Sequence, residues 1–211
     1  MSVDHGDHTH PGTDSSDLSG YAGRIRAIEA LLVDKGILTS EEIQTTVDNV
    51  EARSPADGSR IVARAWADPE FKSRLLSNPH GALEELGFQV PETTPKIAVV
   101  ENTGSVHHIV VCTLCSCYPR ALLGRPPDWY KSFSYRSRAV NEPQAVMKEF
   151  GLELSAETEV RVLDSTADLR YLVLPKRPTG TETMDEKELA KLVTRDSMIG
   201  VTEARSPEAV A

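Results

Sequence analysis

The sequence predicts an α+β protein in which helices come first and a mixed layer of strands and helices follows. Apolar residues recur at helical spacing in the first part of the chain, as Ile25, Ile28, Leu31 and Leu32 show. From residue 96 the pattern changes to short runs that are typical of strands. The expected strands are 96–101, 106–112, 159–164 and 170–175, with 159–164 and 170–175 as a pair of strands joined by residues 165–168.

Capping residues indicate where the helices begin and end. Gly36 ends the first helix, expected at 21–34, because glycine readily adopts the left-handed conformation after a last turn. The run 39–42 (TSEE) begins the second helix, with a hydroxyl at the cap and acids in the first turn. The other helices are expected at 59–66, 69–76, 82–86, 141–150 and 185–193, the last capped by Thr183.

These elements divide the chain into three parts. Residues 1–20 are polar and rich in His, Asp, Ser and Gly, so we expect a disordered tail. Residues 21–95 have no obvious core of their own and are expected to form an extended helical arm. Residues 96–211 contain all of the predicted strands and are expected to form a layered α-β-β-α domain.

Composition and charge exclude several functional classes. A net charge of -9 and a pI near 5.2 argue against a nucleic-acid partner, which needs a basic face. No apolar run approaches the ~18 residues that cross a membrane. The first residues show neither the basic nor the apolar region of a secretory signal, so we expect a cytoplasmic protein.

The three cysteines of the chain lie within six residues, Cys112–Cys117, here called the cysteine loop. They follow a predicted buried strand, and Pro119 comes soon after them. A turn can place sulfurs at i, i+3 and i+5 on one side, and thiolates select transition metals. The loop therefore predicts a metal site.

Two other interpretations of the cysteine loop remain open. Cys112 and Cys115 form a CxxC, but this redox motif normally opens a helix, and Pro119 with the prolines at 126–127 argues against one. A structural disulfide gains little support in a chain without a secretory signal. A structural zinc ion would need a fourth ligand, such as His107, His108 or a residue of another chain.

The cysteine loop resembles the metal-binding segment of the nitrile hydratase α subunit, and the metal-binding subunit of thiocyanate hydrolase has a closely related segment. The similarity extends over about residues 21 to 201. The segments that carry it are 63–72 (ARAWADPEFK), 111–119 (VCTLCSCYP), 123–131 (LGRPPDWYK), 135–138 (YRSR) and 192–201 (LVTRDSMIGV).

The resemblance implies a ligand set within the loop. Cys112, Cys115 and Cys117 would provide sulfurs, and the backbone amides of Ser116 and Cys117 would provide nitrogens. Thr113 after the first cysteine indicates non-corrin Co(III) rather than Fe(III). Cys115 would be oxidised to a sulfinic acid and Cys117 to a sulfenic acid. Cys117, Cys115 and Ser116 would then be the catalytic residues.

The resemblance also implies an activity and partners. The chain would be the catalytic subunit of a nitrile hydratase, a lyase that hydrates a small-molecule nitrile to its amide, in a hetero-oligomer. Its arm would pack on a second, β-type subunit, which in some relatives is split into two chains, and an activator protein would deliver the metal. The alternatives are the metal-binding subunit of thiocyanate hydrolase, which forms carbonyl sulfide and ammonia, and a non-catalytic metal-binding module.

Three residues are candidates for the substrate pocket: Arg120, Trp129 and Tyr130. Nitrile hydratases usually carry Trp at the position of Arg120. The arginine therefore favours a polar or anionic substrate, and at this position the chain resembles thiocyanate hydrolase. Trp129 and Tyr130 follow two prolines on a loop, where packing is an equal alternative.

The sequence predicts less specific roles for four other side chains. One of His107 and His108 is expected to face inward and the other outward along a strand. We expect ordinary strand histidines with satisfied hydrogen bonds rather than groups that bond to the metal ligands. Arg136 is expected to pair with an acid at an interface or to be solvated, as is Arg138.

Overall fold

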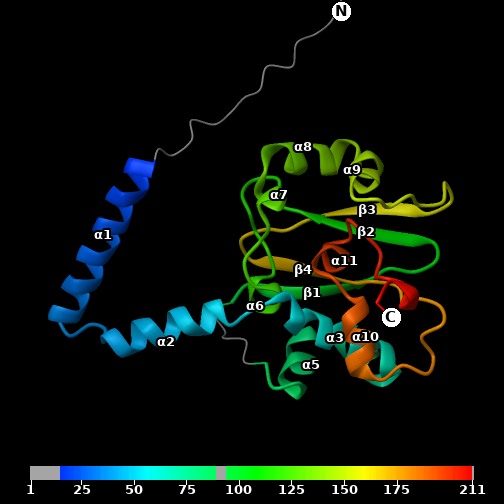
Figure 1. Cartoon of the computed structure of the whole chain (residues 1–211), viewed down its shortest axis with the longest axis horizontal. Coiled ribbons are helices and arrows are strands. Elements are labelled where there is room, and N and C mark those ends of the chain that lie inside the picture. The colour runs from blue at the N-terminus through cyan, green and yellow to red at the C-terminus, as the bar shows by residue number, and fades with distance from the viewer. Residues whose placement is uncertain (1–14, 89–93, 211) are drawn as a thin grey trace, which may run out of the picture. The chain divides into compact units, whose positions relative to one another are not determined.

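The computed structural model describes residues 15–88 and 94–210, and its contacts divide the chain into two units, Met1–Asn49 and Val50–Ala211 (Figure 1). This division differs from the boundary expected at residue 95, because the helices after residue 50 pack into the second unit. Most of the predicted tail lies outside the described residues, and the described part, from Ser15, is already helical.

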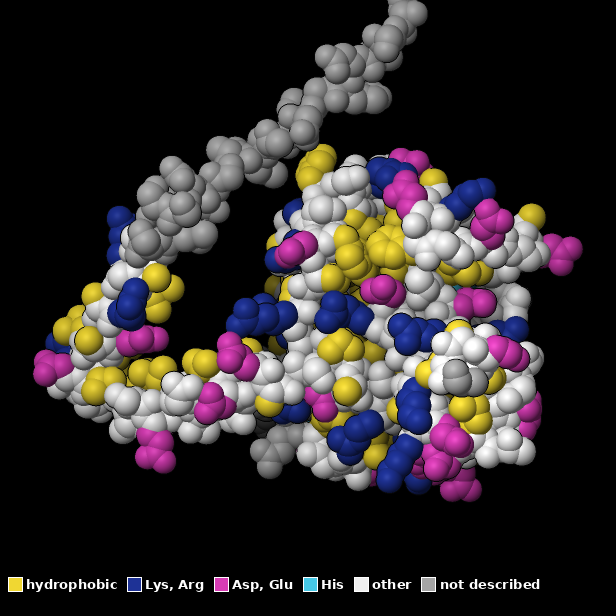
Figure 2. Space-filling model, in the orientation of Figure 1, with side chains coloured by type: hydrophobic (Ala, Val, Ile, Leu, Met, Phe, Trp, Pro, Cys, Tyr) yellow, Lys and Arg dark blue, Asp and Glu magenta, His cyan; other side chains and the backbone are white. Residues whose placement is uncertain are grey.

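The first unit contains α1 (Ser15–Asp34) and most of α2 (Ser40–Glu51). Thr39 caps α2, since its Oγ1 accepts from the Glu42 amide at 3.1 Å and its own amide donates to the Glu42 carboxylate at 2.8 Å. Many apolar side chains on these helices and in the turn between them are exposed, as Figure 2 shows in yellow. They include Tyr21, Ile25, Ile28, Leu31, Ile37 and Val47.

The second unit contains two sheets of two parallel strands each. β1 (Lys96–Glu101) pairs with β4 (Leu169–Leu174), and β2 (Val106–Val111) pairs with β3 (Glu159–Asp164). The four predicted strands are therefore present. The expectation that the last two form a joined pair is wrong, because each pairs in parallel with an earlier strand.

Helices cover the sheets on both sides (Figure 1). α8 (Phe133–Asn141) packs on β2 and α9 (Pro143–Glu149) packs on β3. α11 (Arg195–Ile199) contacts β4, β2 and α3. α3 (Pro55–Ala67), α4 (Pro69–Ser77), α5 (Pro79–Glu85) and α10 (Glu186–Leu192) form the other layer, with α4 and α5 against β1. The α+β class and its layers are confirmed.

The remaining elements are short. They are α6 (Arg120–Leu123), α7 (Asp128–Lys131) and a 3-10 turn, η1 (Pro207–Ala209). α10 is capped by Asp185, whose carboxylate accepts from the Glu188 amide at 2.8 Å, and not by Thr183 as expected. Within the described ranges, none of the helices combines the length and the apolar character that a membrane span requires.

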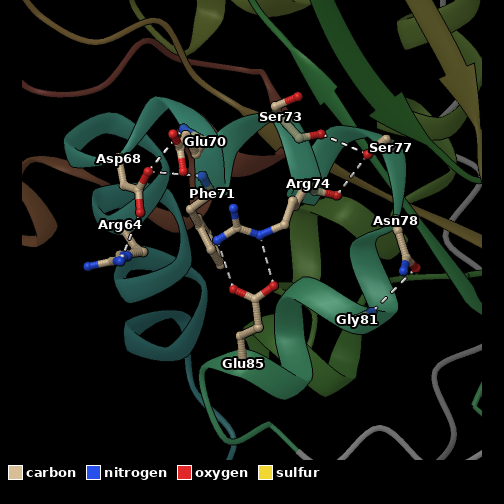
Figure 3. A network of polar contacts seen from close by, with 10 residues as sticks. All are labelled: Arg64, Asp68, Glu70, Phe71, Ser73, Arg74, Ser77, Asn78, Gly81 and Glu85. Carbon is tan, nitrogen blue, oxygen red and sulfur yellow. Dashed lines mark hydrogen bonds and ion pairs between the residues drawn. The ribbon is translucent and has the colours of Figure 1, made fainter.

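Polar contacts fix the corner between α3, α4 and α5 (Figure 3). Asp68 caps α4 by accepting from the amides of Glu70 and Phe71 at 2.9 and 3.0 Å. Arg74 on α4 and Glu85 on α5 form two parallel hydrogen bonds of 2.9 and 3.0 Å. The corner presents Phe71 and its neighbours to the core, which explains why residues 55–85 belong to the second unit.

Asn102, in the turn between β1 and β2, joins both histidines of β2. Its Oδ1 accepts from the backbone amide of His108 at 2.8 Å and from the His108 ring at 3.0 Å. Its amide nitrogen must then donate to His107 Nδ1, at 3.1 Å, which leaves the proton on His107 Nε2 to bond the Gly200 carbonyl at 2.8 Å. Both histidines are buried, so the expectation that one would face outward is wrong.

Candidate metal centre

The cysteine loop begins where β2 ends, and it brings its three sulfurs together. All three Sγ atoms lie within 4.8 Å of one another, and all three cysteines are free. Cys115 Sγ is 3.3 Å from Cys112 Sγ and 3.1 Å from Cys117 Sγ, while the Cys115 amide donates to Cys112 Sγ at 3.3 Å. The predicted turn thus brings the three thiols together as a set.

The spacing of the sulfurs tests what kind of ion would fit them. With metal–sulfur bonds of about 2.3 Å, two sulfurs lie about 3.8 Å apart at the tetrahedral angle and about 3.3 Å apart at a right angle. The separations of 3.3 and 3.1 Å fit right angles. Among the described residues the cluster contains three ligating side chains and no fourth. The separations from Cys115 therefore fit an ion with ligands at right angles better than tetrahedral structural zinc.

The backbone on either side of the sulfurs is held from α7 and α8. The Tyr135 hydroxyl donates to the Val110 carbonyl at 2.6 Å, and the Tyr130 hydroxyl donates to the Cys117 carbonyl at 2.7 Å. Arg136 donates from Nε to the Cys112 carbonyl at 3.1 Å and from Nη2 to the Thr113 carbonyl at 2.7 Å. Within the part of the chain that the structure describes, Arg136 pairs with no acid and bonds these two carbonyls instead, whereas Arg138 pairs with two acids, Glu142 and Glu149.

Asp164 holds the loop from β3, a role that was not predicted. Its Oδ1 accepts from the Thr113 amide at 3.0 Å and its Oδ2 accepts from the Thr113 hydroxyl at 2.6 Å. The reason is the parallel register, in which Asp164 lies opposite Val111. Polar residues at the carboxyl ends of two parallel strands lie at one edge, so recognition of that pairing would have revealed the contact.

Exposure differs sharply along the loop. Cys112 and Cys117 are buried, while Cys115 and Ser116 are exposed and the Leu114 side chain is 91% exposed. Burial raises the pKa of the Cys117 thiol to about 12, while the hydrogen bond from Cys117 lowers the pKa of Cys115. A bound metal ion would favour the thiolate form of the buried Cys117 against this effect of burial.

The three predicted pocket residues lie in different environments. Arg120 is exposed at the start of α6. Tyr130 is fully buried, and its hydroxyl donates a hydrogen bond to the Cys117 carbonyl, so it supports the backbone of the loop. Trp129 is half-buried, and its ring packs edge-on against Tyr130, Tyr135 and Phe150.

The two other interpretations of the cysteine loop can be compared with this geometry. CxxC redox motifs open a helix, but Cys112 and Cys115 lie in a turn, and a single helical turn begins only at Arg120, after Pro119. Both ring nitrogens of His107 are engaged elsewhere, so it is not free to be a fourth zinc ligand.

Comparison with known proteins agrees with the geometry. The family model described as "Nitrile hydratase, alpha chain" matches residues 19–202. The chain belongs to the nitrile hydratase α-chain family. The resemblance predicted from the cysteine loop and its flanking segments is confirmed, and with it the predicted function and enzyme class at the level of this family.

Members of the nitrile hydratase family and one related enzyme are similar over most of their length. The chain is 50% identical over 187 residues to the low-molecular weight cobalt-containing nitrile hydratase subunit alpha of Rhodococcus rhodochrous, covering 88% of this chain and 90% of that one. It is 40% identical to the thiocyanate hydrolase subunit gamma of Thiobacillus thioparus, covering 83% and 76%. The structure of an Fe-type nitrile hydratase double mutant from Comamonas testosteroni Ni1 matches with a TM-score of 0.80 and 40% identity, covering 90% and 92%.

Proposed function

We propose that this chain is the catalytic subunit of a cobalt nitrile hydratase, which hydrates a nitrile to the corresponding amide. The observation that carries the proposal is the cluster of three sulfurs, with Cys115 Sγ at right-angle spacing from the other two, in a chain half identical to a cobalt-containing α subunit. Cys112, Cys115 and Cys117 would hold the ion with the backbone amides of Ser116 and Cys117. Thr113 supports Co(III) over Fe(III).

The residues of the loop have distinct parts in the proposed reaction. A bound cobalt ion supplies Lewis-acid chemistry, which polarises a nitrile or acidifies a water. Cys115, exposed, is the proposed sulfinic acid, and Cys117, deeper, is the proposed sulfenic acid. An oxygen on Cys117 can take a proton from an attacking water or attack the nitrile carbon itself. Ser116 would contribute its backbone amide nitrogen as a ligand.

The proposed enzyme is a hetero-oligomer. A β-type subunit is implied for an α chain, and the exposed apolar side chains of α1 and α2 support an arm that packs on this partner. A split partner of two chains and an activator protein that delivers cobalt are further parts of the proposal. Three free thiols suit a reducing compartment, which supports a cytoplasmic location.

The second candidate activity is thiocyanate hydrolysis to carbonyl sulfide and ammonia. The observation that favours it is Arg120, an exposed cation three residues after Cys117, because a guanidinium attracts an anionic substrate. The 40% identity to a thiocyanate hydrolase subunit supports the same alternative. Trp129 is half-buried and follows Arg120 by nine residues. We propose that its ring forms an apolar wall of the substrate pocket for either substrate.

Metal analysis and mass spectrometry of the purified complex test the proposal. Protein from cobalt-supplemented cells should carry about one cobalt per chain, and the peptide with the cysteine loop should gain three oxygens. Zinc alone, or a disulfide in the loop, would support a non-catalytic module. Amide formed from a nitrile panel, compared with carbonyl sulfide formed from thiocyanate, separates the two enzymes.

A further inference from the structure

Arg136 is a cation that the chain itself places against the cysteine loop. Its guanidinium makes two hydrogen bonds to consecutive carbonyls, those of Cys112 and Thr113, at 3.1 and 2.7 Å. In an extended strand successive carbonyls point to opposite sides, so two neighbours that face one guanidinium mark a change of backbone direction. The arginine therefore sits at the point where β2 turns into the loop.

The two peptide groups around Thr113 are held from two elements. Asp164 on β3 accepts hydrogen bonds from the Thr113 amide and hydroxyl. Arg136 on α8 donates hydrogen bonds to the carbonyls of Cys112 and Thr113. An acid and a base thus fix opposite edges of this peptide segment. The Cys112 side chain, only 1% exposed, has its direction set by this segment.

The position of α8 does not depend on Arg136. Ser132 caps the helix by accepting from the Tyr135 amide at 3.1 Å, and the Tyr135 hydroxyl bonds the Val110 carbonyl. Ala139 and Tyr135 bury the inner face of the helix. Replacement of Arg136 should therefore leave α8 in place and release only the two carbonyls.

We propose that Arg136 is a positioning residue for the metal centre, which orients the Cys112–Thr113 backbone so that the Cys112 sulfur meets the ion together with those of Cys115 and Cys117. This inference rests on the proposed cobalt function. Lysine cannot replace the arginine, because one ammonium lacks the planar fork that spans two carbonyls. Arg138, on the same helix but bound to Glu142 and Glu149, offers a matched control.

The test compares Arg136→Lys with Arg138→Lys in the complex of the full chain and its partner. We expect Arg136→Lys to lower cobalt retention against a chelator about 10–100-fold, as loss of a residue that orients metal ligands typically does. We also expect a shift of the visible sulfur-to-cobalt absorption band. Arg138→Lys should retain the wild-type cobalt content and band. Equal behaviour of the two variants, whether both unchanged or both impaired, would overturn the proposal.

A second measurement uses the full-length chain without metal. Iodoacetamide should label exposed Cys115 quickly and buried Cys112 slowly in the wild type. Arg136→Lys should accelerate labelling of Cys112 several-fold, while Arg138→Lys should not. An unchanged Cys112 rate in Arg136→Lys would contradict the positioning role. Because this readout needs no cobalt, failure of the wild-type protein to bind cobalt would refute the proposed function separately.

Discussion

The cysteine loop and the first unit differ in where their side chains find partners. The backbone of the loop is held by Tyr130, Arg136 and Asp164, all from the same chain. The helices α1 and α2 instead expose apolar side chains that in a stable monomer would normally be buried. The cysteine turn is thus held by contacts within the chain, whereas the exposed apolar side chains of the first unit support the proposal that it packs on a second protein.

The largest expected effect removes a sulfur from the loop. Cys117→Ala should abolish both cobalt retention and turnover, because no other side chain of the described cluster can replace the lost ligand. Ser116→Ala is the matched control, since the proposed ligand at that position is the backbone amide, and it should keep its cobalt. Cobalt per chain and the rate of amide formation measure both. Full hydration activity in Cys117→Ala would remove the loop from the mechanism.

The next largest effect tests whether the hydrogen bonds from Asp164 of the same chain position the cysteine loop. Asp164→Asn keeps the shape of the side chain but weakens both bonds to Thr113, and we expect about a 10–100-fold loss of cobalt affinity. Asp168→Asn, an exposed neighbour in the same connection, serves as control. Competition with a chelator measures the affinity. Identical affinities for the two variants would mean that Asp164 does not support the site.

Lysines on the first unit test the other half of the comparison. Ile25→Lys with Ile28→Lys should change the free energy of unfolding of the isolated chain by no more than about 0.5 kcal/mol, because both side chains are 57% exposed. The same pair should weaken assembly with the β-type subunit, measured by size-exclusion chromatography. Thr45→Lys, on a polar and exposed position of α2, should leave assembly intact. A large stability loss in the isolated chain would show that the helices pack internally.

The smallest effect concerns the histidines before the loop. Burial lowers the pKa of His107 below its ordinary value near 6.5, so the unfolded chain takes up the proton first as the pH falls. The free energy of unfolding should therefore decrease as the pH falls from about 6.5 to 5.5. His107 should contribute at most about 1.4 kcal/mol per pH unit to this decrease.

Chemical denaturation at pH 7.5 and 5.5 measures this dependence. His107→Gln should make the stability less dependent on pH, while His80→Gln, on an exposed position of α5, should not. Burial lowers the pKa of His108 as well, so part of the dependence should remain in the first variant. A slope unchanged by His107→Gln would show that the Asn102 network does not exclude the proton.

Local patterns in the sequence predicted most elements but not their pairing. The strand bounds Lys96–Glu101 and Glu159–Asp164 match the structure, because alternation and turn residues are local signals. Parallel pairing of β2 with β3 depends on contacts between distant segments, which local patterns do not indicate. The contact of Asp164 with the cysteine loop could not be predicted without this pairing. The core contacts of α3 to α5 were missed for the same reason, and these helices were assigned to the arm.

The candidate site divides in the same way. The metal-binding character of the loop follows from three thiols in six residues, a feature of composition and spacing alone. The partner of Arg136 is a pair of backbone carbonyls, and no sequence pattern indicates such an acceptor. Tyr130, predicted near the substrate, is buried under the loop, because its hydroxyl satisfies the Cys117 carbonyl.

The distance in sequence between Thr113 and Asp164 has a consequence for biosynthesis. Fifty-one residues separate them, so a ribosome that adds about 5–20 residues per second makes the cysteines roughly 3 to 10 s before the carboxylate that fixes their turn. During that interval the thiols are on a nascent chain without their anchor. Synthesis of β3 then supplies Asp164 and completes the contacts to Thr113.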